Sequence, residues 1–287
     1  KEQGYTNTFF YGGDGYFDNM NHFFGNNGYN IVERGRKLLN ETYEGTRTLI
    51  PDEDVTFENA WGICDEDIFN VVIKDADEKY KSKQSFNNFI MTTSNHRPYT
   101  FPKGKINLPT GTREAAVRYT DYAIGNFIDK IKNKPWFNNT VIIIVADHCA
   151  SSAGKNEIDI SKYQIPCMIL NLKDHAAMNI SKMTSQVDLF PTLWSMLDWN
   201  YGNEFYGKNV LSNDYQPRVF LGTYQKLGYL KADSLVLLSP QRKVETYLYN
   251  KAKNEQKPAK LSKKVIDEGI ANYQTAFDLF KDGILKL

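Results

Sequence analysis

The chain has 287 residues, with 35 basic and 34 acidic side chains, and its formal net charge is +1. This near balance of charge argues against a general affinity for nucleic acid or for an anionic membrane surface. No stretch approaches the ~20 apolar residues of a transmembrane helix, so we expect the chain as given to be soluble. Its three cysteines are odd in number and widely spaced, which predicts neither a disulfide framework nor a zinc knuckle.

The first part of the chain predicts a strand, a glycine-rich turn and a short helix. Residues 5–11 (YTNTFFY) have the composition of a strand, and residues 12–15 (GGDG) follow it directly. The backbone of such a turn could approach a ligand closely, although a plain tight turn explains the glycines equally well. Residues 17–24 predict a short helix, and residues 27–60 an irregular surface excursion.

A second strand ends in a histidine and an arginine. Residues 65–81 predict an amphipathic helix with Asp65 as its N-terminal cap, and residues 86–93 predict the strand that follows. Just beyond this strand, Arg97 could pair with an anionic oxygen, and His96 could bind one or transfer a proton. A loop histidine satisfied by ordinary hydrogen bonds is the alternative.

The run at residues 141–145 (VIIIV) predicts a central strand. Its residues are all β-branched and do not alternate with polar ones, which is typical of a parallel strand buried on both faces. Asp147 and His148 follow it at once, where the ligand crevice of an open α/β sheet lies. A carboxylate and an imidazole side by side suit a divalent cation. A capping aspartate and a hydrogen-bonded histidine are the alternative.

The remaining chain predicts one more strand, a helix and a change of architecture. Residues 164–172 predict a strand, and the next helix begins near Asp188, with Pro191 in its first turn and Asp188 as a cap rather than a metal ligand. After residue 201, short segments separated by turn residues predict an antiparallel meander, closed by an amphipathic helix at residues 262–281. The fold class is therefore α/β, a mostly parallel central sheet flanked by helices, with a small C-terminal antiparallel sheet and closing helix.

Five motifs occur in an order that resembles a known family: YGGDGYFDNMNHFFG, WGICDEDIF, TTSNHRPY, ADHCASSAG and QVDLFPTL. Together they resemble the extracytoplasmic domain of the lipoteichoic acid synthase family. That family is a sulfatase-like branch of the alkaline phosphatase superfamily and includes phosphoglycerol transferases. The resemblance covers roughly residues 4 to 200. It implies an N-terminally truncated sulfatase-like α/β domain over residues 1–200, with residues 201–287 packed on the same domain.

The resemblance also implies the roles of several residues. Asp147 and His148 would hold a divalent metal, Mn²⁺ first, with Zn²⁺ or Mg²⁺ as alternatives. His96 would bind the substrate head group, with Arg97 as a weaker candidate. Asp18 falls in the segment that lines the glycerol-phosphate pocket, where Gram-positive-type synthases carry a Trp and an Arg. This chain has Asp18 and Met20 there, which leaves phosphoglycerol specificity open.

For the complete protein, the resemblance implies a metal-dependent phosphoglycerol transferase that acts through a covalent threonine intermediate. The threonine and a further metal-binding acid are expected upstream of Lys1, so we expect this fragment to be inactive alone. The implied partners are a phospholipid head group and a glycan or polymer acceptor, with no nucleic acid. The implied location is the extracytoplasmic face of a bacterial cell membrane, in the periplasm or at the cell surface, with N-terminal spans as the membrane tether. The alternatives are a sulfatase or phosphodiesterase of the same superfamily, and a catalytically inactive binding module.

Overall fold

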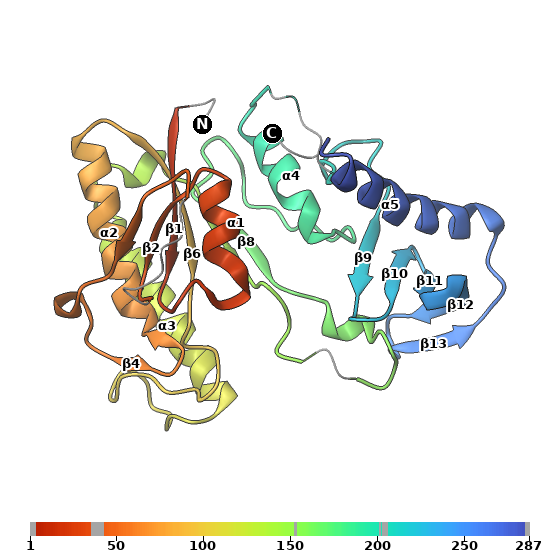
Figure 1. Ribbon diagram of the computed structural model, residues 1–287, viewed down its shortest axis with the longest axis horizontal. Coiled ribbons are helices and arrows are strands. Elements are labelled where there is room, and N and C mark those ends of the chain that lie inside the picture. The colour runs from red at the N-terminus through yellow and green to blue at the C-terminus, as the bar shows by residue number, and fades with distance from the viewer. Residues whose placement is uncertain (1–3, 36–42, 152–153, 201, 203–205, 285–287) are drawn as a thin grey trace. The chain divides into compact units, whose positions relative to one another are not determined.

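The computed structural model describes all residues except 1–3, 36–42, 152–153, 201, 203–205 and 285–287 (Figure 1). The chain forms two compact units, Lys1–Thr140 and Val141–Leu287. The expected boundary near residue 200 follows the extent of the family resemblance and stays a prediction.

The first unit is built on a sheet of four parallel strands. Their order is β3 (Arg47–Leu49), β2 (Asn30–Glu33), β1 (Tyr5–Tyr11) and β6 (Ser85–Met91). Every pairing in this sheet is parallel. The predicted parallel sheet is therefore confirmed, and so is the predicted strand at residues 5–11.

Helices cover both faces of this sheet (Figure 1). Alternate residues of β1 point to opposite faces, as the period of a strand requires. Phe10 packs in a core cluster with residues of α2 (Asp65–Lys81) and α3 (Arg113–Ile131). Phe9 lies on the other face, where its ring stacks on Phe24 of α1 (Met20–Asn26) at 3.9 Å between centroids.

Several short elements complete the first unit. The β4 strand (Glu58–Asn59) and the β5 strand (Gly62–Ile63) form a small antiparallel hairpin. Single turns of 3₁₀ helix are η1 (Phe17–Asn19), η2 (Asp52–Asp54) and η3 (Phe137–Asn139).

In the second unit, the predicted central parallel strand is corrected. The β7 strand (Ile142–Val145) pairs with β8 (Cys167–Leu170), and this pairing is antiparallel. Val145 is 37% exposed. A parallel neighbour needs a crossover, usually a helix. The described residues between β7 and β8 supply only the single turn η4 (Ile160–Lys162). The β-branched run predicted a strand correctly, but such a run does not specify the direction of its partner.

The next helix begins as predicted. The η5 turn (Gln186–Asp188) leads into α4 (Leu189–Met196), with Pro191 in the first turn of α4. Asp188 and Ser185 form a capping box, in which the backbone N–H of Ser185 donates to Asp188 Oδ2 at 3.0 Å. Asp188 occupies the N-cap position of α4, as predicted, but its side chain makes no cap hydrogen bond to that helix; it serves instead as the N3 acid of the capping box, with Ser185 as the N-cap.

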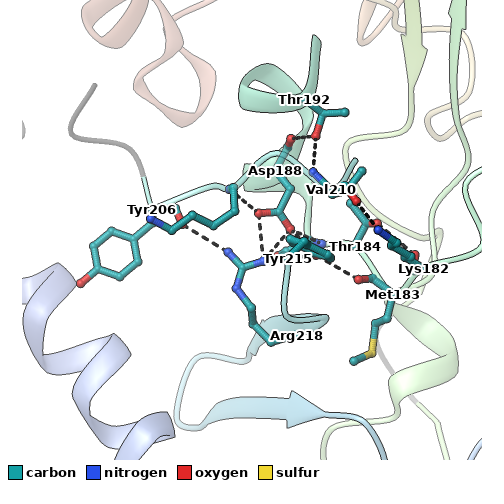
Figure 2. Close-up of polar contacts among 11 residues, drawn as sticks. Lys182, Met183, Thr184, Asp188, Thr192, Tyr206, Val210, Tyr215 and Arg218 are labelled. Carbon is teal, nitrogen blue, oxygen red and sulfur yellow. Dashed lines mark hydrogen bonds and ion pairs between the residues drawn. The ribbon is translucent and has the colours of Figure 1, made fainter. Parts of the chain in front are cut away.

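Asp188 also holds the start of the C-terminal sheet (Figure 2). Its carboxylate is fully buried and accepts two hydrogen bonds from Arg218 Nη1, at 2.9 and 2.7 Å, and one from the Tyr215 hydroxyl at 3.0 Å. The backbone N–H of Lys208 donates to Oδ1 at 2.8 Å. With these contacts Asp188 is a structural acid.

The predicted C-terminal meander and closing helix are also confirmed. Five antiparallel strands lie in the order β13 (Glu255–Pro258), β12 (Lys243–Asn250), β11 (Ser234–Ser239), β10 (Leu227–Lys231) and β9 (Arg218–Gly222). The η6 turn (Pro240–Arg242) joins β11 to β12. The α5 helix (Lys263–Lys281) packs on this sheet, where the Tyr273 hydroxyl lies 2.6 Å from the carbonyl oxygen of Gly228. No helix in the described part of the chain is long and apolar enough to cross a membrane.

Candidate functional site

The glycine-rich turn after β1 is fixed by close backbone packing. A Cβ atom added to Gly13 would clash with the carbonyl oxygen of Trp61, and one added to Gly62 would clash with the carbonyl oxygen of Gly12. Gly62 also has a φ of +133°, a conformation that side chains with a Cβ rarely adopt. The turn at the end of β1 and the β4–β5 hairpin therefore interlock, backbone against backbone.

A buried carboxylate holds the same turn from the other side. Glu33, at the end of β2, is fully buried. It accepts hydrogen bonds from the backbone N–H of Gly15 at 2.5 Å, from Asn21 Nδ2 at 2.9 Å and from Arg47 Nε at 2.5 Å. Sequence reasoning missed Glu33. An acid that follows two apolar residues at the end of a strand (NIVE) is a weak sequence signal for such an anchor.

Aromatic rings meet at this edge of the sheet. The Phe17 ring meets Trp61 edge-on, with 5.0 Å between centroids, and the Trp61 ring lies 3.6 Å from the His96 ring at an angle of 41°. Asp18, predicted to bind substrate, follows Phe17 directly and is exposed. The pKa of Tyr11 is raised to about 12, chiefly by burial and further by the negative charges of Asp14, Asp18 and Glu33. The Tyr11 hydroxyl therefore stays protonated.

The loop that carries His96 is anchored by Asp65. This carboxylate is fully buried, and its Oδ1 accepts the backbone N–H groups of Thr93 at 3.0 Å and Ser94 at 2.9 Å. Its Oδ2 accepts the Thr120 hydroxyl at 2.9 Å. Asp65 was expected to cap α2, but the helix shows no side-chain cap, and Cys64 occupies the N-cap position. Asp65 makes tertiary contacts instead of a cap, because the buried backbone N–H groups of Thr93 and Ser94 need an acceptor. Burial raises the pKa of Asp65.

The His96 loop presents charged groups to solvent. His96 and Arg97 are both exposed, and His96 Nδ1 lies 3.3 Å from the carbonyl oxygen of Arg97. Arg113 Nη2 donates to the Tyr99 hydroxyl at 3.4 Å. Arg113 first, and Arg97 second, lower the pKa of Tyr99. Positive charge therefore gathers next to His96, as an anionic ligand would require.

A separate surface cavity of about 1160 Å³ lies beside α3. Leu108, Arg113, Val117 and Tyr122 are among the residues that line it. None of the predicted site residues lines this cavity, so the volume of a cavity does not by itself identify the functional site of this chain.

In the second unit, Asp147 and His148 lie side by side after β7. His148 Nε2 is 3.3 Å from Asp147 Oδ2, and the backbone N–H of His148 donates to Asp147 Oδ1 at 2.7 Å. Their side chains are 67% and 77% exposed, respectively. Two hydrogen bonds to the backbone of Ala146 hold the turn. The N–H of Ala146 donates to the carbonyl oxygen of Pro166 at 3.3 Å, and the side-chain Nε2 of Gln186 donates to the carbonyl oxygen of Ala146 at 3.2 Å.

This pair fits a divalent cation. Two donor atoms about 2.1 Å from one ion lie roughly 3.4 Å apart at a tetrahedral angle, close to the distance between Nε2 and Oδ2. His148 Nδ1 lies 2.7 Å from the carbonyl oxygen of Cys149. A proton on Nδ1 makes this contact a hydrogen bond and leaves the Nε2 lone pair for a metal, the arrangement common to histidine ligands. Within the described ranges, no group of three His, Cys, Asp or Glu side chains is placed to hold a metal ion.

The predicted residues are thus found in two places. Asp18, His96 and Arg97 belong to the first unit, and Asp147 and His148 belong to the second. Their convergence on one pocket stays a prediction. Sequence reasoning missed Trp61 and Glu33, whose partners are distant in the chain.

Comparison with known proteins identifies the family. Residues 1–199 match the sulfatase family. Phosphoglycerol transferase I of Salmonella choleraesuis is 25% identical over 267 residues, which cover 88% of this chain and 33% of the relative. The same protein of Citrobacter koseri gives the same figures. The chain therefore spans about a third of the length of the curated relatives that it matches.

Solved structures agree with this assignment. The structure of a protein in the alkaline phosphatase superfamily from Vibrio parahaemolyticus has a TM-score of 0.86 and 32% identity, over 98% of this chain and 67% of that one. The lipoteichoic acid synthase LtaP from Listeria monocytogenes has a TM-score of 0.73 and 20% identity, over 99% and 71% of the two chains, and shows the shared fold. Because the family match covers more than half of the chain, the chain belongs to the sulfatase family of enzymes, in the alkaline phosphatase superfamily that its five motifs predicted.

Proposed function

We propose that this chain is part of a metal-dependent phosphoglycerol transferase that acts on a phospholipid head group. The proposed location is the extracytoplasmic face of a bacterial membrane, with a glycan or polymer hydroxyl as the acceptor. The relatives named phosphoglycerol transferase I support the activity. The observation that carries the proposal is the donor pair of Asp147 and His148, 3.3 Å apart and open to solvent.

The residues of the chain have distinct tasks in this proposal. Asp147 and His148 hold a divalent cation, Mn²⁺ first, with Zn²⁺ or Mg²⁺ as alternatives. When bound, such a cation is a Lewis acid that offsets the negative charge developing on a phosphoryl group. His96 orients the transferred group, and Arg97 pairs with one of its anionic oxygens. Asp65 keeps the His96 loop in place through the backbone N–H groups of residues 93 and 94.

The proposal assigns the nucleophile to a threonine outside these 287 residues. Its hydroxyl attacks the phosphodiester and displaces diacylglycerol, and the acceptor hydroxyl then takes the phosphoglycerol group from the threonine. Thr93 lies near His96 in sequence, but it is buried and its hydroxyl donates to the carbonyl oxygen of Ile63 at 2.6 Å. Because the Thr93 hydroxyl is buried and already hydrogen-bonded, it is not placed to attack a substrate, which supports a nucleophile elsewhere.

A second candidate is a sulfate ester hydrolase, because the family that matches residues 1–199 is the sulfatase family. The same donor pair would suit a sulfuryl group as well as a phosphoryl group. A binding module without catalysis is the remaining alternative.

The test is release of diacylglycerol from phosphatidylglycerol vesicles by the full-length protein with Mn²⁺. Asp147→Asn and His148→Ala should each abolish release, because each removes one of the two donors. Asp129→Asn is the matched control, since Asp129 is 70% exposed on α3 and its charge pairs with the exposed Lys132. Hydrolysis of 4-nitrophenyl sulfate without diacylglycerol release would favour the sulfatase. Absence of both reactions would favour the binding module.

A further inference from the structure

We propose that Trp61 is a further substrate-binding residue, whose indole forms the apolar wall on which the carbon skeleton of a polyol phosphate packs. The inference rests on the proposed function and identifies the part of the substrate that the Trp61 side chain contacts. Trp61 would thus recognise the glycerol part of the transferred group, while His96 and Arg97 recognise its phosphate.

The place of Trp61 in the fold favours binding over core packing. Trp61 lies in the turn between β4 and β5 and is only half-buried. It stands outside the three hydrophobic core clusters of the described residues. Its ring partners are themselves exposed: Phe17, 47% exposed, and His96. A large aromatic ring at the carboxyl edge of a parallel sheet stands where ligands of such sheets bind.

The backbone around Trp61 is held firmly enough to preorganise the ring. Its N–H donates to Asn59 Oδ1 at 2.8 Å. Asn59 Nδ2 in turn donates to the carbonyl oxygen and hydroxyl of Thr100, at 3.2 and 3.0 Å, and so ties the hairpin to the chain just beyond His96. The carbonyl oxygen of Trp61 packs on Gly13. A backbone held in this way lowers the entropic cost of positioning a ligand against the ring.

The chemistry of the ring suits a polyol. The face of an indole carries negative electrostatic potential, and the C–H groups of a carbon chain that bears hydroxyls are weakly positive. The hydroxyl groups can meanwhile remain in contact with water. An inorganic phosphate has no carbon skeleton and gains nothing from the ring. Trp61 should therefore discriminate between a polyol phosphate and phosphate itself.

The position of the Trp61 ring also bears on residue 18, where this chain differs from the family that it resembles. The family resemblance associates an aromatic side chain with that position, where this chain has Asp18. Trp61 contacts Phe17, the residue next to it, and approaches from a different element of the fold. The hairpin thus supplies an aromatic wall that residue 18 does not.

The test compares two probes, sn-glycerol 1-phosphate and inorganic phosphate, by titration calorimetry and by tryptophan fluorescence on the 287-residue chain. Trp61→Ala should weaken binding of glycerol 1-phosphate about tenfold, which is about 1.4 kcal/mol at 25 °C, and change phosphate binding less than about twofold. Trp61→Phe keeps a ring and should lose roughly threefold. His96→Ala should weaken both probes. Phe23→Ala is the matched control, because Phe23 is a 62% exposed aromatic residue of the same unit.

Three outcomes of this test would contradict the role of Trp61. Equal weakening of both probes by Trp61→Ala, no weakening of either, or a wild type that prefers neither probe would overturn the inference. Circular dichroism and thermal denaturation check that the variants fold, and Trp61→Phe keeps the test informative if Trp61→Ala does not. Diacylglycerol release by the full-length protein is measured separately. Release without probe discrimination refutes the inference alone, and discrimination without release refutes the proposed function alone.

Discussion

Replacing Asp65 should show how much a buried carboxylate contributes to holding the His96 loop. In Asp65→Ala, the backbone N–H groups of Thr93 and Ser94 and the hydroxyl of Thr120 lose their shared acceptor. Each buried donor left without a partner costs roughly 1–3 kcal/mol. Water entering the space left by the side chain would satisfy part of this demand. We therefore expect Asp65→Ala to lower the free energy of unfolding by about 3–5 kcal/mol.

Asp65→Asn separates hydrogen bonding from charge. The amide oxygen can still accept both backbone N–H groups, and the Thr120 hydroxyl can rotate to accept from the amide nitrogen, so the loss should be about 1 kcal/mol. Because burial raises the pKa of Asp65 in the folded state, its protonation favours the folded protein. The stability of the wild type relative to Asp65→Asn should therefore be greatest below the unfolded pKa of about 3.9 and decline as the pH rises through the folded pKa.

Urea denaturation followed by circular dichroism at several pH values measures both effects. Asp129→Asn, an exposed change on α3, is the control and should shift the unfolding free energy by less than about 0.5 kcal/mol. The reasoning fails if Asp65→Ala and Asp65→Asn are equally stable. It also fails on the electrostatic side if the difference between the wild type and Asp65→Asn does not depend on pH.

Three further changes test other parts of the structure. Gly13→Ala should lower the unfolding free energy measured by thermal denaturation by more than about 2 kcal/mol, because the new Cβ would clash with the carbonyl oxygen of Trp61. Gly125→Ala on α3 is the control: its Cβ would meet no atom within 4 Å, so this change should stabilise the chain slightly. Arg218→Met removes the charged partner of the buried Asp188 and should cost about 3–5 kcal/mol of unfolding free energy. Calorimetry should find weak binding of Mn²⁺ to the 287-residue chain, because among the described residues the site has the two donors Asp147 and His148, and Asp147→Asn should abolish this binding. Tight one-to-one binding would show that the site has been misplaced.

The elements set by local pattern could be predicted from the sequence. The helix predicted at residues 65–81 matches α2, and the strand predicted at residues 5–11 matches β1. Their apolar periodicity and their bounding turns lie within the segments themselves. A helix start near Asp188 could also be predicted, because a proline is tolerated in the first turn of a helix but not in its interior, and α4 begins at Leu189.

Contacts between distant segments could not be predicted in this way. The direction of the β7–β8 pairing depends on how the chain returns between the two strands, which the β-branched run does not encode. The partners of Asp65 lie near residues 93 and 120, so its role could not be separated from that of a helix cap. Trp61 and His96 are likewise remote in sequence, and their ring contact depends on the hairpin and the His96 loop folding together.

Burial separates the acids that build this fold from those that can act on a ligand. Glu33, Asp65 and Asp188 are fully buried, and each accepts several hydrogen bonds from the chain, so their oxygens are committed. Asp147 is 67% exposed, and its sequence neighbour His148 is its partner among the described residues. A carboxylate that must take up a cation has to keep lone pairs directed at open space, and a fold stabilised by that carboxylate would resist the exchange. The exposure of Asp147 is therefore the property that a metal ligand requires.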